Sequence, residues 1–230
     1  MVSKSRVLIA LALLGPVSAT LAGCASNGEL VVDEGVGVTA VRTACPAVGI
    51  ADYTGDLTVL TNGDTDSRAI DLVAAMTHVR ADCDQAGVNL DSARYKPKGL
   101  VTTKVGFDVL VRRTDTHGAR DVMLPYFVTV MRGGNVVIAK RVSTVAVHFA
   151  DGQNRAIAHG EGSAVIDKAD ATLSREIRER ITKKRTAGEA DAATDPLADP
   201  AVKAAVARAT FEVLVGFQLT DQQLAYNATR

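Results

Sequence analysis

The stretch VTTKVGFDVLV, residues 101–111, alternates between two kinds of side chain with a period of two. One set is polar, charged or glycine, and only Leu110 interrupts it. The other set can fill a core and consists of Val101, Thr103, Val105, Phe107, Val109 and Val111. Because successive side chains of a strand point to opposite faces of a sheet, the pattern predicts a β-strand with one buried face.

The segments around this strand predict a mainly β fold. Residues 123–131 are apolar on both faces, as in a central strand, and Gly133-Gly134-Asn135 offers a hairpin turn into a strand over 136–149. Further strands are expected at 47–60, 70–83, 162–166 and 211–219. About seven strands joined by polar turns predict an antiparallel β-sandwich with an immunoglobulin-like layout.

Residues 170–210 interrupt this pattern and predict a helical and flexible insertion. Leu173, Ile177 and Ile181 recur every four residues, which indicates a helix over 170–185, packed on the edge of the sandwich with its charged face outward. The basic residues of that helix leave open a contact with anionic headgroups or an acidic partner. Residues 186–199 are typical of an acidic linker.

The sequence predicts the starts of two helices in the C-terminal part of the chain. Asp199-Pro200 supplies an N-cap and a first helical residue for a helix through Ala209. After the last strand, Thr220-Asp221-Gln222-Gln223 has the spacing of a capping box. A short C-terminal helix is therefore expected.

The beginning of the chain predicts export and lipidation. Lys4 and Arg6 precede an apolar run over 7–14 that is too short to span a bilayer, and the run leads to Leu21-Ala22-Gly23-Cys24. These four residues resemble the lipobox of bacterial lipoproteins. The resemblance implies a signal peptide at 1–23, acylation of Cys24 and a lipidated tether over 24–44. The sandwich domain is expected over 45–230, because the period of two dominates from Cys45 onward. Multiple acyl chains on Cys24 would anchor the protein to a membrane.

Charge and composition exclude some functions. Lys4 and Arg6 leave with the signal, so about 207 residues remain, with 24 basic and 26 acidic side chains. Such a balance provides no field that would recruit nucleic acid. The chain has no Trp, which disfavours a carbohydrate platform. No cofactor is predicted.

Two cysteines remain once Cys24 is acylated, and they predict a disulfide. Cys45 and Cys83 form an even pair for an oxidising compartment. Their bridge would close a loop of about 39 residues, which the chain-entropy model credits with roughly 4 kcal/mol. The alternative, a metal or nucleophilic thiol, is disfavoured because no second Cys or His lies at ligand spacing.

One polar row is a candidate for catalysis. His159, Glu161 and Ser163 alternate, so a strand would present all three on one face. The Gly-x-Ser-x-Gly elbow of hydrolases is absent, because Val165 follows Ser163 by two residues. A solvated strand face is the favoured interpretation, and no catalytic residue is assigned.

The remaining polar clusters predict no metal site. Asp64 and Asp66 suggest the start of a calcium loop, but Arg68 and Ala75 occupy later ligand positions, so a turn is expected. The other histidines, His78, His117 and His148, are isolated in the sequence. A metal site built from ligands that are distant in sequence stays an open alternative.

Three motifs resemble a family of uncharacterised alphaproteobacterial lipoproteins. The longest is VGFQLTDQQLAYN at 215–227, in which VGFQLT-x-x-QLAYN is the shared pattern. The others are Cys45-Pro46, followed by a later Cys, and Pro125-Tyr126-Phe127-Val128. The resemblance implies an envelope location and a domain over 45–230, and it implies no activity; it does not extend to 170–210.

These observations predict a non-enzymatic accessory or interaction module of the cell envelope, with a possible protein partner there. Ala25 and Ser26 follow Cys24 without the Asp that retains some lipoproteins at the inner membrane, so we expect the periplasmic side of the outer membrane. The alternatives are a carrier that holds a small ligand or lipid in an apolar cavity, and a hydrolase. An apolar pocket above about 300 Å³ would favour the carrier, and a flat exposed patch would favour the interaction module.

Overall fold

The computed structural model describes residues 43–61, 66–84, 99–183, 188 and 194–229. The expected signal peptide, Cys24 and the tether up to residue 42 lie outside the described residues, as does Asp64. The chain is already in the core at Ala44, whose surface is 5% exposed.

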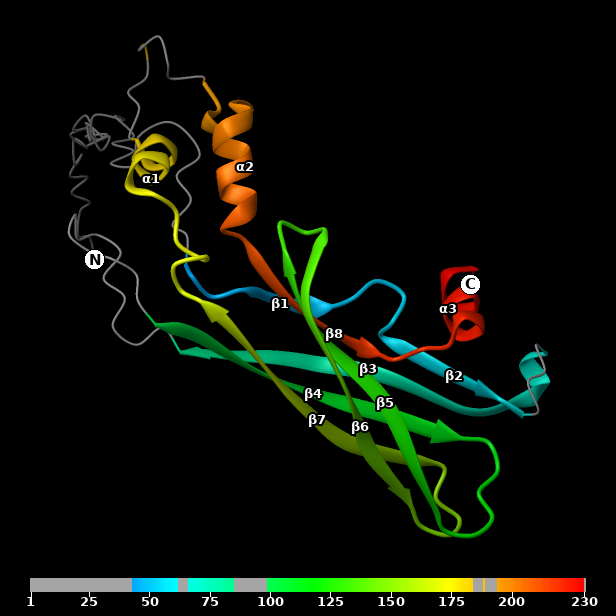
Figure 1. Ribbon diagram of the computed structural model, residues 1–230. Helices are drawn as coiled ribbons and strands as arrows, with labels where there is room; N and C mark the ends of the chain where they lie inside the picture. Colours follow the sequence, from blue (N-terminus) through cyan, green and yellow to red (C-terminus); the bar gives the residue numbers. More distant parts are fainter. Residues whose placement is uncertain (1–42, 62–65, 85–98, 184–187, 189–193, 230) are drawn as a thin grey trace, which may run out of the picture. The chain divides into compact units, whose positions relative to one another are not determined.

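Two four-stranded sheets form the domain (Figure 1). One sheet has the strand order β1-β8-β5-β6, and the other has the order β2-β3-β4-β7. The strands are β1 (Ala47–Ile50), β2 (Asp56–Leu60), β3 (Ile70–Asp84), β4 (Leu100–Arg113), β5 (Arg120–Arg132), β6 (Val136–Phe149), β7 (Arg155–Asp167) and β8 (Phe211–Phe217). The prediction of a mainly β sandwich with helical additions is confirmed. One pair departs from the antiparallel arrangement, because β1 runs parallel to β8.

The strand predicted from residues 101–111 is β4, and it contributes a buried face to the core. Its core-facing side chains are almost fully buried, from Val101 at one end to Val111 at the other. The predicted last strand is β8, whose alternate residues Phe211, Val213, Val215 and Phe217 are buried as expected. Together with the inner faces of β3, β5 and β6, these side chains form one core between the sheets.

The predicted single strand at 47–60 is wrong, because the structure divides it between the two sheets. β1 pairs with β8, whereas β2 pairs with β3. A turn separates them: the Thr54 N–H donates to the Ala51 carbonyl at 3.1 Å, and Tyr53 has a φ of 62°. The chain thus crosses from one sheet to the other at residues 51–55.

The predicted strand at 162–166 is too short, since β7 extends from Arg155 to Asp167. Its core-facing residues are all small over most of its length, as Gly160 and Gly162 illustrate. The Phe107 ring occupies the space where Gly160 has no side chain, and Val128 does the same at Gly162. Small side chains give little hydrophobic signal in the sequence, yet here they let large neighbours pack.

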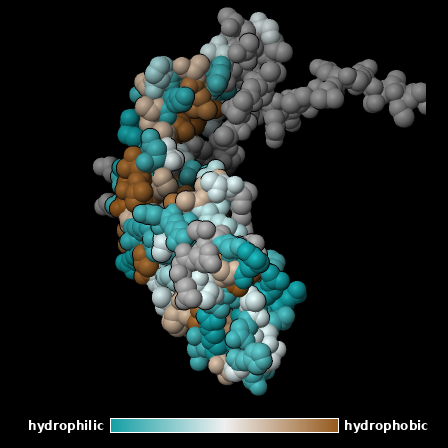
Figure 2. Space-filling model, turned by 90° about the vertical axis from the view of Figure 1, so that its right-hand side faces the viewer, coloured by the Kyte–Doolittle hydropathy of each residue, from teal (hydrophilic) through white to brown (hydrophobic). Residues whose placement is uncertain are grey.

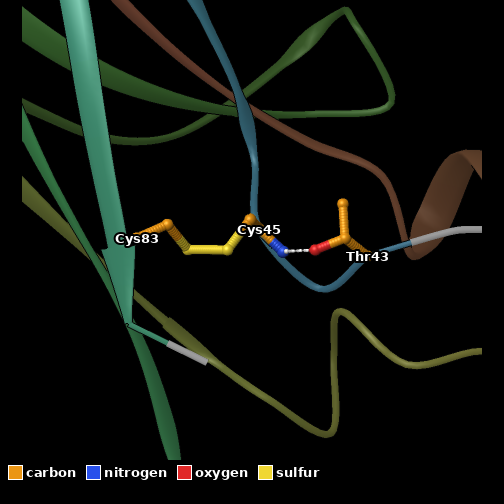
Figure 3. The surroundings of a disulfide bond; sticks show 3 residues. All are labelled: Thr43, Cys45 and Cys83. Carbon is orange, nitrogen blue, oxygen red and sulfur yellow. Dashed lines mark hydrogen bonds between the residues drawn. A yellow bond between two sulfur atoms is a disulfide. The ribbon is translucent and has the colours of Figure 1, made fainter. Parts of the chain in front are cut away.

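The predicted disulfide is present and joins the two sheets (Figure 3). Cys45 lies two residues before β1, the edge strand of the first sheet, and Cys83 lies near the end of β3. Their Cα atoms are 6.1 Å apart. The Cys45 N–H also donates to the Thr43 hydroxyl at 3.0 Å.

The helices of the insertion are α1 (Arg175–Thr182) and α2 (Pro200–Arg208). Leu173 and Ile181 pack with Val202 and Ala209 in a small cluster separate from the main core. The expectation that the first helix packs on the sandwich edge is therefore wrong: its apolar stripe is covered by α2. Part of the expected linker, Pro196–Ala198, forms a 3₁₀ turn, while residues 186–187 and 189–193 lie outside the described part.

The capping predictions are confirmed. The Asp199 carboxylate accepts the Ala201 N–H at 2.8 Å at the start of α2. At the start of α3 (Asp221–Thr229), the Thr220 N–H donates to Gln223 Oε1 and the Gln223 N–H donates to the Thr220 hydroxyl. Because Gln223 Nε2 also donates to the Thr58 carbonyl, the C-terminal helix is attached to β2.

Candidate functional site

The sheet β2-β3-β4-β7 has one side turned away from the core, and we call this side the outer face. Strand register places its side chains in rows across β3, β4 and β7. The central row contains Thr77, Asp108 and His159. The outer face also contains the predicted row of His159, Glu161 and Ser163, and all three of these residues are exposed.

Asp108 binds two histidines, one from each neighbouring strand. Nδ1 of His159 lies 2.6 Å from one carboxylate oxygen, and Nδ1 of His78 lies 3.0 Å from the other. An ionised carboxylate can only accept hydrogen bonds, so both Nδ1 atoms carry a proton. In each imidazole, the contact with Asp108 is therefore made by Nδ1 and not by Nε2.

His78 reaches Asp108 because of an irregularity in β3. The pairing of β3 with β4 shifts between Thr77 and Arg80, and His78 has a φ of 50°. A bulge commonly redirects a side chain in this way. The interpretation of His78 as isolated is therefore wrong, although 30 residues separate His78 from Asp108 and 51 separate Asp108 from His159. No local spacing could have revealed the group.

The two histidines lower the pKa of Asp108. The hydrogen bond from His159 is the largest cause, partial burial opposes it, and the hydrogen bond from His78 adds to it. The imidazoles are well exposed, so solvent screens the pairs and their contribution to stability is small.

The predicted polar row does not form a catalytic triad. His159 and Asp108 resemble the base and the orienting acid of a hydrolase, but Ser163 is four residues further along β7. At roughly 3.3 Å per residue this is about 13 Å, far beyond hydrogen-bond reach. Glu161 lies opposite Gly106 in the next row. Within the described ranges, no group of three or more His, Cys, Asp or Glu side chains is arranged to hold a metal ion.

The other histidines lie away from this group. His117 pairs with Asp115 at 2.7 Å, and His148 pairs with Asp121 at 2.7 Å. Asp66 accepts the backbone N–H of Arg68 and binds its guanidinium. These contacts agree with the turn predicted there.

An apolar groove lies on the outer face at the end of the sheet beyond Asp108, and we call it the groove. It has a volume of about 730 Å³. Leu110 and Ile157 lie opposite each other in it and are 40% and 65% exposed. The next row places Arg112 opposite Arg155. The groove therefore combines an apolar surface with two adjacent cations.

A second depression of about 560 Å³ lies on the other side of Asp108. Gly106 lines it and has no neighbouring atom within 4 Å of the place where a side chain would begin. Its rim is charged and polar and includes Arg80, Asp82, Lys104, Glu161 and Ser163. Two of the three residues of the predicted polar row therefore line a hollow instead of contacting His159.

A separate surface lies on the free edge of the other sheet. β6 is the last strand in the order β1-β8-β5-β6, and its first nine residues, 136–144, are all exposed. We call this segment the β6 edge. Its large hydrophobic side chains are 49–59% exposed and belong to Val136, Val137, Ile138 and Val142. Figure 2 shows hydrophobic residues gathered at the surface along the left margin of its view.

Comparison of the chain with models of protein families, with curated proteins and with solved structures finds no match in any of the three. Among the described helices, none is long and apolar enough to cross a membrane.

Proposed function

We propose that the protein is a lipoprotein of the cell envelope that is anchored through Cys24 and acts by binding a protein partner, without catalysis. The lipobox-like ending at Cys24 and the resemblance to alphaproteobacterial lipoproteins support the anchor and the location, which we place on the periplasmic side of the outer membrane. The disulfide between Cys45 and Cys83 is also of a kind that persists in oxidising compartments.

The observation that carries the binding function is the β6 edge. Soluble proteins usually protect an edge strand, because its unpaired N–H and C=O groups can pair with another chain. Here nine consecutive residues are exposed, and four of them are large and hydrophobic. Such a segment suits the addition of an extended strand from a partner, in which main-chain hydrogen bonds provide affinity.

The charges of the β6 edge indicate the chemistry of that strand. Lys140 and Arg141 are its charged residues, and it contains no acid. Lysine on an edge often prevents strand pairing, but the Lys140 ammonium lies 4.6 Å from the centre of the Phe127 ring on the neighbouring strand. The Lys140 ammonium thus lies over the Phe127 ring of its own sheet. A partner strand with acidic residues among apolar ones would complement the edge.

Site-specific photo-crosslinking tests the proposal. A photoreactive amino acid at position 138 of the full-length chain should give a discrete protein adduct in cells that export and lipidate it. The same residue at position 123 is the control, because Met123 is 58% exposed but lies on β5, opposite Ala146 of β6 and away from the β6 edge. No adduct from position 138, or the same adduct from both positions, would contradict the proposal.

A carrier is the second candidate, and the groove favours it. Its volume of about 730 Å³ falls in the range of small-molecule sites. It differs from the expected apolar cavity, because it is a groove on the outer face and its residues Leu110 and Ile157 are open to solvent. A hydrolase has less support, because Ser163 lies far from His159 along β7.

A further inference from the structure

Two arginines lie side by side at one end of the groove. Arg112 of β4 and Arg155 of β7 are direct cross-strand neighbours, and both side chains are exposed. Like charges in this arrangement normally destabilise a sheet. In the part of the chain that the structure describes, no ion pair joins either guanidinium to an acid. An anion placed between them would relieve the repulsion and accept hydrogen bonds from both.

The neighbouring rows of the groove are apolar. Leu110 and Ile157 follow the arginines on β4 and β7, and Val73 and Ala75 continue the surface on β3. An alkyl chain that starts at the arginines can therefore extend along the sheet over exposed hydrophobic side chains. Each methylene that leaves water there strengthens binding.

The wall of the groove opposite β7 is formed by β2 and is attached to the C-terminal helix. Asp56 of β2 lies in the same row as Ala75 and Leu110, on the side opposite to β7. Its backbone carbonyl accepts a hydrogen bond from Asn227 of α3, so this wall is fixed to the C-terminal helix.

We propose that the groove binds an anionic amphiphile, with its carboxylate or phosphate between Arg112 and Arg155 and its alkyl chain over Leu110 and Ile157. A free fatty acid and a lipid with an anionic phosphate headgroup both have the chemistry that the groove complements, and labelling with matched probes distinguishes them. The proposal does not depend on the β6 edge, which lies in the other sheet.

Photo-labelling with acyl probes tests this site. The full-length lipidated protein is placed in nanodiscs of zwitterionic phospholipid and exposed to probes that share one diazirine-bearing alkyl chain. The arms are a fatty acid, a phosphatidic acid, a phosphatidylcholine and the uncharged fatty alcohol. Labelled peptides are identified by mass spectrometry. We expect labelling of the β4 and β7 segments at the groove by one or both anionic probes, and the more effective arm identifies the source of the anion.

Charge-reversal variants distinguish a specific site from general partition into the membrane. Arg112→Glu with Arg155→Glu should reduce labelling by the anionic probes about tenfold, the order expected for two exposed ion pairs. Arg80→Glu with Lys104→Glu is the matched control, because it reverses two charges on the same outer face around the second depression. If the first pair of substitutions alters the circular dichroism spectrum, Arg112→Gln with Arg155→Gln replaces it.

Three results would overturn the proposal: equal labelling of the groove by the fatty alcohol, equal loss in both double variants, or no label at the groove from either anion. None of these results bears on crosslinking from position 138, so failure of this proposal and failure of the protein-binding proposal are distinguishable.

Discussion

Cys45 is bonded to Cys83, and this one covalent link connects the start of the sheet β1-β8-β5-β6 to the other sheet. The bridge spans 38 positions of the sequence. It therefore restricts the unfolded chain across β1, β2 and most of β3, in addition to holding the native sheets together.

Replacing Cys45 and Cys83 with Ala should lower the free energy of unfolding by about 2–4 kcal/mol, because the unfolded chain regains its freedom. Denaturant unfolding of the double variant and the parent measures this difference. Thiol titration is the companion test: neither Cys should react in the native protein until a reductant is added. Two reactive thiols before reduction would contradict the bridge.

Gly160→Ala should destabilise the domain by about 1–3 kcal/mol, because the new methyl group would overlap the Phe107 ring. Phe107 cannot easily move, since it also packs edge-on against Tyr126 with ring centres 5.0 Å apart. Gly106→Ala is the matched control on the paired strand, with open space around the added group, and should change stability by about 0.5 kcal/mol or less. Similar melting curves for the two variants would show that Gly160 is not under the ring.

The difference in stability between the parent and Asp108→Asn should depend on pH. The pKa of Asp108 is lowered in the folded protein, chiefly by the hydrogen bond from His159. Such a carboxylate adds stability above its unfolded pKa of about 3.9, and that stability disappears as the pH falls through the folded value. We expect the difference to be present above about pH 4 and to shrink below it, and to flatten when His78 and His159 are both replaced with Ala. A difference that persists unchanged to about pH 2 would contradict the pairing.

Cys24→Ala should abolish lipidation, because Cys24 is the cysteine that ends the lipobox-like sequence. Metabolic labelling with a fatty acid, followed by purification of the full-length chain, measures the attached label. Cys45→Ala is the control and should keep it. Label retained by Cys24→Ala at the level of the parent would exclude Cys24 as the anchor.

The sequence predicts those elements whose signal is local. Residues 101–111 predict β4 because large apolar and polar side chains alternate there, and Thr220 with Gln223 predicts the cap of α3 because the two residues contact each other across one turn. β7 was underestimated because Gly160 and its small neighbours on the core side form a buried face without hydrophobic bulk.

Other features depend on contacts between distant residues. The group of Asp108 with His78 and His159 requires the register of three strands and a bulge in β3. The division of residues 47–60 between two sheets likewise follows from which strands pair, and no local pattern in the sequence reveals that pairing. The exposure of the β6 edge has the same origin, since its apolar residues resemble those of a buried strand.

The protein-binding function is tested most directly by the yield of adduct from a photoreactive residue at position 138 in two variant backgrounds. Val142→Asp places a charge on the β6 edge, and Met123→Asp places one on an equally exposed site of β5. Both side chains are exposed, so each variant should retain its fold within about 0.5 kcal/mol. A partner strand would have to bury the new carboxylate at position 142 without a partner for it, at a cost of about 1–3 kcal/mol. We predict about a tenfold loss of adduct in Val142→Asp and none in Met123→Asp; equal yields in the two backgrounds would contradict binding at this edge.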